Sequence, residues 1–201
     1  MLGAFGQMTE AGWYNAAYRV VGAVLIPAIF LGNSFLPALS KRILSSAGSL
    51  QALWERQVEA ALVIGVPASI GGAMMAPGLI RTLYTPEFEP AIFALQILIW
   101  TVALTFLVSA CSYMLFVAGA QKKILWIAAI GAVGNILLNL WLIPAYSLYG
   151  AAVATVVTYI VISILYGEAV RRYTPARIFT LSLGKVRFMG GGAGGIMALV
   201  L

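Results

Sequence analysis

Several apolar runs of about 20 residues constrain this chain more than any other feature of its sequence. An α-helix rises 1.5 Å per residue, so roughly 20 apolar residues cross a hydrocarbon core of about 30 Å. Only 9% of the 201 residues are charged and 62% are hydrophobic, whereas soluble proteins contain about 25% charged residues. We therefore expect an all-α integral membrane protein.

The apolar runs predict a bundle of five complete transmembrane helices and a partial sixth. Pro67 predicts a kink in the second helix, and Pro77 and Pro144 predict the ends of the second and fourth. A turn over 146–150 then reverses the chain. The predicted helices cover residues 12–39, 58–80, 91–118, 124–143 and 151–169, and the partial segment covers 188–201.

Two polar stretches interrupt the apolar runs within what we expect to be a single transmembrane domain, residues 1–201. Residues 40–57 are expected to form a cytoplasmic amphipathic linker. Its later part has apolar residues at helical spacing, typical of an interfacial helix. Residues 171–187 are expected to form a basic cytoplasmic linker.

The distribution of Lys and Arg predicts the orientation. Residues 40–57, 120–123 and 171–187 hold three, two and five of them, whereas the opposite loops hold one, Arg81. Basic loops stay in the cytoplasm, so the N-terminus is expected outside the cytoplasmic membrane. This orientation explains the net charge of +6 better than a nucleic-acid partner does. Because the chain starts outside and its last apolar segment is short, we expect it to be a piece of a longer transporter.

No catalytic residue, metal site or cofactor is predicted. The chain has no His and no Asp, and its one Cys, Cys111, lies inside an apolar run. A Cys–His nucleophile is therefore excluded, and clustered metal ligands are lacking. Residues 190–195 formally satisfy G-x-G-x-x-G, but no strand precedes them. Their small-residue spacing favours close helix packing instead.

Four polar residues inside the predicted helices are candidates for a substrate cavity. Arg19 lies about seven residues inside the first helix, where a charge costs about 2.5 kcal/mol or more, so it is expected to face a cavity; the alternative is snorkelling toward the headgroups. Asn135 and Asn139 lie one turn apart and either line a polar path or hold helices together. Asn15 carries the same ambiguity.

Several segments of the chain resemble a family of transporters in their order and spacing. The first, residues 12–19 followed by 36–40, resembles the G-x-Y-x-A-x-R and P-x-L-S pattern of bacterial and archaeal polysaccharide flippases. The others resemble the basic turn, the N-x-x-L-N and L-I-P block and the G-A-A-x-A-T block of that family, and they lie at residues 118–123, 135–144 and 150–155. The chain is therefore identified as similar to one lobe of a flippase of the multidrug, oligosaccharidyl-lipid and polysaccharide exporter superfamily.

The resemblance implies the fold, the partners and the role of Arg19. Members have two pseudo-symmetric lobes around a central cavity, and this chain is similar to the second, C-terminal lobe. In the related lipid II flippases, the Arg that matches Arg19 is placed to meet the substrate pyrophosphate. The implied partners are a lipid-linked oligosaccharide, the lipid bilayer and the N-terminal lobe.

The implied activity is transport and not enzyme catalysis. A flippase of this family moves lipid-pyrophosphate-linked oligosaccharide across the membrane for surface polysaccharide biosynthesis. A drug or cation antiporter of the same superfamily is one alternative, although no acidic residue is predicted within the membrane to carry a coupling ion. A non-catalytic membrane assembly subunit is another. A membrane glycosyltransferase is disfavoured because it would usually use carboxylates or His.

Overall fold

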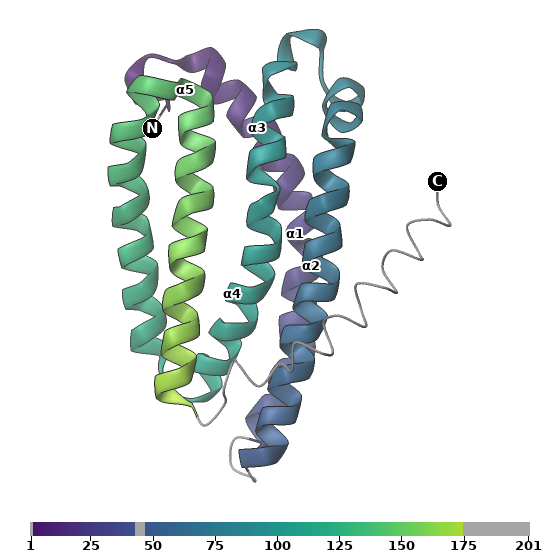
Figure 1. Ribbon diagram of the computed structural model, residues 1–201, viewed down its shortest axis with the longest axis vertical. Coiled ribbons are helices and arrows are strands. Elements are labelled where there is room, and N and C mark those ends of the chain that lie inside the picture. Colours follow the sequence, from purple (N-terminus) through teal and green to yellow (C-terminus); the bar gives the residue numbers. More distant parts are fainter. Residues whose placement is uncertain (1, 43–46, 175–201) are drawn as a thin grey trace.

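The computed structural model describes residues 2–42 and 47–174, and every regular element in that part of the chain is helical. Four of the helices are long and apolar enough to cross a membrane, so the predicted all-α membrane class is confirmed. The elements pack side by side as a bundle (Figure 1). They are η1 (Leu2–Phe5), α1 (Met8–Arg42), α2 (Ala47–Leu83), η2 (Pro86–Phe88), α3 (Pro90–Leu98), α4 (Trp100–Val117) and α5 (Gln121–Tyr173).

The predicted number of complete helices, five plus a partial sixth, differs from the four found in the described residues. The difference lies in α5, which continues through Pro144 and covers both the fourth and the fifth predicted helices. Its direction reverses at Ser147, whose φ of 47° is left-handed, so α5 runs as two antiparallel legs (Figure 1). A Cβ on Gly150 would lie 2.3 Å from the Leu142 carbonyl oxygen, so the returning leg needs glycine there. The segment 188–201 lies outside the described residues.

The helix α2 is longer than the sequence predicted at both ends. It passes through Pro77, where an end was expected, and stops at Leu83. Its first turns cover the predicted interfacial helix, but Leu50 and Trp54 are each only 1% exposed. They pack with residues of α1 and α4, and the cytoplasmic position expected for residues 40–57 stays a prediction. This part of the chain extends α2 and packs against protein.

A serine of α2 explains the break between α3 and α4. The Ser69 hydroxyl lies 2.9 Å from the Gly65 carbonyl oxygen and 3.1 Å from that of Ile99, and it accepts a hydrogen bond of 3.1 Å from the Ala103 N–H. A side chain inserted into the helical ladder in this way is a recognised cause of a break. A Cβ on Gly72 would lie 2.6 Å from Ile99, so small residues bring the helices this close.

Basic residues gather at one end of the bundle. The C-terminal end of α1, the turn from α4 to α5 and the end of α5 lie together, whereas η2 and the Ser147 reversal lie at the other end with the N-terminus (Figure 1). Lys41, Lys122 and Arg171 belong to the first group. Arg81, near the other end, forms an exposed ion pair of 2.9 Å with Glu89. The basic linker predicted over 171–187 lies mostly outside the described residues.

Candidate functional site

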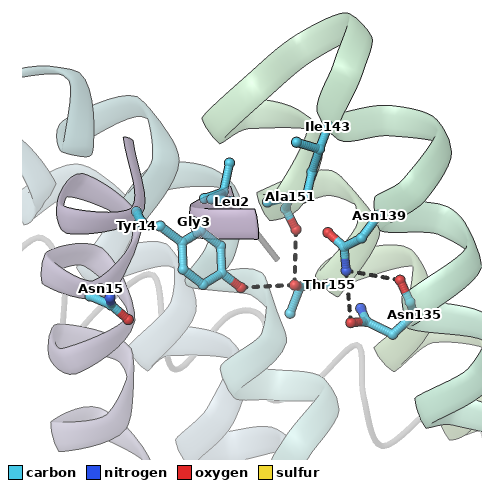
Figure 2. A pocket seen from close by; sticks show the side chains of 10 residues that line it. Leu2, Gly3, Tyr14, Asn15, Asn135, Asn139, Ile143, Ala151 and Thr155 are labelled. Carbon is cyan, nitrogen blue, oxygen red and sulfur yellow. Dashed lines mark hydrogen bonds between the residues drawn. The ribbon is translucent and has the colours of Figure 1, made fainter. Parts of the chain in front are cut away.

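A pocket of about 270 Å³ opens between α1 and α5 at the end of the bundle opposite the basic turns. None of its lining residues is charged. Amides and hydroxyls from α1 and both legs of α5 surround it, closed on one side by η1 (Figure 2). The lining residues are Leu2, Gly3, Ala11, Tyr14, Asn15, Asn135, Asn139, Ile143, Ala151 and Thr155.

Asn139 and Asn135 form a fixed hydrogen-bond relay on the first leg of α5. The Asn139 amide nitrogen donates to the Asn135 backbone carbonyl and to its side-chain oxygen, both at 2.8 Å. The Asn135 nitrogen in turn donates to the Thr158 hydroxyl of the second leg at 3.1 Å. Because a backbone carbonyl can only accept, the Asn139 nitrogen must face Asn135. Its oxygen is therefore turned toward the pocket (Figure 2).

A second polar contact joins α1 to the other side of the pocket. The Thr155 hydroxyl donates to the Ala151 carbonyl at 2.9 Å and has only one proton. The Tyr14 hydroxyl, also 2.9 Å from Thr155, is therefore the donor of that contact. Tyr14 keeps its own oxygen lone pairs available at the pocket edge. The ring of Tyr18 stacks on that of Tyr14 with centroids 5.9 Å apart.

The structure brings together three of the four predicted site residues. Asn15, Asn135 and Asn139 line the same pocket, although they are far apart in sequence. Asn135 joins the two legs of α5 through Thr158, whereas the hydrogen bonds of Asn139 go to Asn135 on its own leg. Whether they bind a substrate stays a prediction.

Arg19 lies outside the pocket lining. It is exposed on the next turn of α1 after Asn15, on the same face of the helix. Within residues 2–42 and 47–174 it has no ion pair and no side-chain hydrogen bond. Arg19 thus lies on an exposed part of α1, one turn along the helix from Asn15 of the pocket lining, and its predicted role stays untested.

Tyr14 and Thr155 are pocket residues that the analysis of single positions missed. Both belong to segments that carry the flippase resemblance, residues 12–19 and 150–155. A hydroxyl group within an apolar helix needs a hydrogen-bond partner, and this requirement could have identified both residues as candidates. Which helix supplies that partner depends on helix packing and cannot be read from spacing alone.

Several long apolar helices around an uncharged polar pocket define a multi-pass α-helical membrane protein. Comparison with known proteins makes the class more specific: the chain is similar to a protein named probable flippase AglR from Haloferax volcanii. The two are 26% identical over 206 aligned positions, which cover 100% of this chain and 42% of the relative. The predicted flippase resemblance is thereby confirmed. No protein-family model matches the chain.

The chain spans less than half the length of this relative. The transport activity, substrate and partners of a whole flippase are therefore matters for proposal. Within the described residues, no three His, Cys, Asp or Glu side chains gather in one place. Cys111 is buried in the interior of the bundle.

Proposed function

We propose that this chain is the C-terminal lobe of a flippase that moves lipid-pyrophosphate-linked oligosaccharide from the cytoplasmic to the outer leaflet. The observation that carries the proposal is the pairing of Arg19, on an open helix face, with an uncharged polar pocket one turn away. Similarity to a protein named as a probable flippase supports it. In this activity no covalent bond is made or broken.

In the proposed topology, five segments cross the membrane. Each leg of α5 contains about 26 residues, which as a helix is about 39 Å long and sufficient to span a hydrocarbon core. The basic turns then face the cytoplasm. The pocket, at the opposite end of the bundle, opens toward the outer side.

The proposed mechanism is alternating access between this lobe and an N-terminal lobe. Transporters built from two related halves rock one half against the other around a site between them. Arg19 would lie at that interface, where its planar guanidinium group can pair with two phosphate oxygens. The lipid tail of the substrate would stay in the bilayer.

The open face of α1 supports this arrangement. A charged side chain directed into lipid is costly, and such residues usually face a bundle interior or a watery cavity. Between residues 125 and 141, on the first leg of α5, all exposed side chains are apolar, as a lipid-facing surface requires. They include Leu125, Trp126, Val133, Leu137 and Trp141.

The test is transport by the full-length flippase reconstituted in vesicles, with the lipid-linked oligosaccharide of its source organism. Arg19→Ala is expected to lower the rate about tenfold or more, the effect of losing a charge-assisted hydrogen bond. Arg19→Lys keeps the positive charge but loses the planar guanidinium group that can donate two parallel hydrogen bonds, so it should retain partial activity. Normal transport by Arg19→Ala at normal membrane abundance would contradict the proposal.

Arg171→Ala is the matched control. Both Arg171 and Arg172 contact Glu168, so Glu168 keeps a partner when Arg171 is removed. The control removes one positive charge at the far end of the bundle and is expected to leave transport unchanged. Residues 1–201 expressed alone should insert in the membrane but should not restore polysaccharide display in a flippase-deficient strain.

A further inference from the structure

The chemistry of the pocket differs from that of Arg19. Among the ten residues that line the pocket, none carries a charge. Pyrophosphate is bound by cationic donors, which this pocket does not supply. Amides and hydroxyls both donate and accept hydrogen bonds, and they match the hydroxyl groups of a sugar, which do the same.

The pocket is also prearranged for such a ligand. Asn139 is only 7% exposed, and two hydrogen bonds to Asn135 fix its amide. Its oxygen, turned toward the pocket, accepts no hydrogen bond within the described part of the chain. Tyr14 is fixed in the same way by its bond to Thr155. A ligand hydroxyl could donate to these oxygens without any rearrangement of the helices.

The size of the pocket limits what it can hold. Its volume of about 270 Å³ lies near the lower end of ligand pockets, which begin at about 300 Å³. One sugar ring fits such a space, whereas a complete oligosaccharide does not. The pocket is therefore suited to a single ring of a longer glycan.

The position of the pocket relative to Arg19 links the two sites. Asn15 lines the pocket, and Arg19 follows it four residues later, about 6 Å along the helix axis. We infer that the pocket binds one uncharged sugar ring of the glycan and selects the glycan, while Arg19 contacts the pyrophosphate. This inference rests on the proposed function. It places the glycan toward the outer end of the bundle.

Binding by the purified full-length flippase in nanodiscs tests the inference with two probes. One is the lipid-pyrophosphate-linked oligosaccharide of the source organism, and the other is the same lipid pyrophosphate without sugar. Asn139→Ala and Asn15→Ala should each weaken binding of the glycan-bearing lipid about tenfold, the effect of one lost hydrogen bond. Both variants should bind the sugar-free lipid as the wild type does. Arg19→Ala should weaken binding of both lipids.

The variants are chosen so that misfolding cannot imitate the result. Asn139 is buried and bonded, so its replacement can disturb the bundle, whereas Asn15 is exposed and makes no side-chain hydrogen bond within the described residues. Asn33→Ala is the matched control. It removes an amide from the same helix about five turns away, where Asn33 bonds Tyr113 at 2.8 Å, and should leave both affinities unchanged.

The outcomes distinguish the sugar-pocket inference from the flippase proposal. Equal losses for both lipids, or no loss in Asn15→Ala and Asn139→Ala, would overturn the sugar pocket and leave the flippase proposal standing. Failure of the wild type to bind either lipid would overturn the proposed function, and the pocket inference with it. Selective loss of the glycan-bearing lipid supports both.

Discussion

Two adjacent glycines of α2, Gly71 and Gly72, test how closely α2 packs against the α3–α4 segment. A Cβ on Gly72 would lie 2.6 Å from Ile99 Cγ1 and 2.9 Å from its Cδ1, whereas a Cβ on Gly71 would meet nothing within 4 Å. Ile99 is fully buried, so its side chain cannot move away freely. Gly72→Ala should therefore overpack the contact between α2 and the α3–α4 segment, and Gly71→Ala should not.

The expected magnitude follows from two opposing effects. Replacing a helical glycine by alanine gains about 1 kcal/mol of helix propensity at either position. Overpacking a buried contact costs about 1–3 kcal/mol. Because the gain is the same for both variants, their difference isolates the steric cost. Gly72→Ala should be about 1–3 kcal/mol less stable than Gly71→Ala.

The assay is unfolding of the purified chain in mild detergent by increasing SDS, followed by tryptophan fluorescence. Ile99→Ala removes the atoms that the new methyl group would meet. When Ile99→Ala is already present, Gly72→Ala should therefore lower the unfolding free energy much less than it does in the wild type. The coupling energy of the two substitutions measures the steric cost of the contact. Equal stability of Gly71→Ala and Gly72→Ala would refute the close packing.

Three further predictions concern polar groups and topology. Gln57→Leu should stabilise the chain by about 1–3 kcal/mol in the same SDS titration, since neither side-chain amide atom of this buried residue has a hydrogen-bond partner among residues 2–42 and 47–174; lower stability would contradict this. Thr158→Val removes the acceptor for Asn135 and should cost about 0.6–2 kcal/mol; a second thermodynamic measurement in an Asn135→Ala background should show no such cost. Single cysteines placed at position 87 or at position 122 in a Cys111→Ala background test the orientation. An impermeant thiol reagent added to whole cells should label the cysteine that replaces Glu87 and should not label the one that replaces Lys122. The reverse pattern would contradict the proposed topology.

The sequence predicted the helices well and their ends less well, for a physical reason. Apolar runs located each helix because only a helix satisfies its backbone polar groups within hydrocarbon. The same requirement helps α2 continue through Pro77 to Leu83, because a helix broken within hydrocarbon would leave backbone groups without partners. The first leg of α5 does break close to its proline, at Ser147, three residues after Pro144. The reversal expected over 146–150 does occur, at Ser147.

The pocket could be predicted only in part. Amides within apolar helices pointed to Asn15, Asn135 and Asn139, and the structure gathers all three. The contacts of Tyr14 with Thr155 and of Asn135 with Thr158 depend on how each helix is rotated about its axis. Close approaches fix that rotation, such as the contact at Gly131, where a Cβ would lie 2.4 Å from Ile162 Cδ1. Such approaches join residues distant in sequence, and one sequence gives no direct signal for them.

The separation of Arg19 from the pocket follows from the same packing and bears on how a charged substrate would be held. A guanidinium group inside the amide-lined pocket would need a permanent counter-ion, since burying an unpaired charge is costly. The pocket offers none. One turn away on an open face, Arg19 can remain hydrated when no substrate is present and lose that water only when phosphate replaces it. An arrangement with the neutral groups enclosed and the cation exposed therefore suits a substrate that has an uncharged glycan and a charged linkage, and that must be released after each cycle.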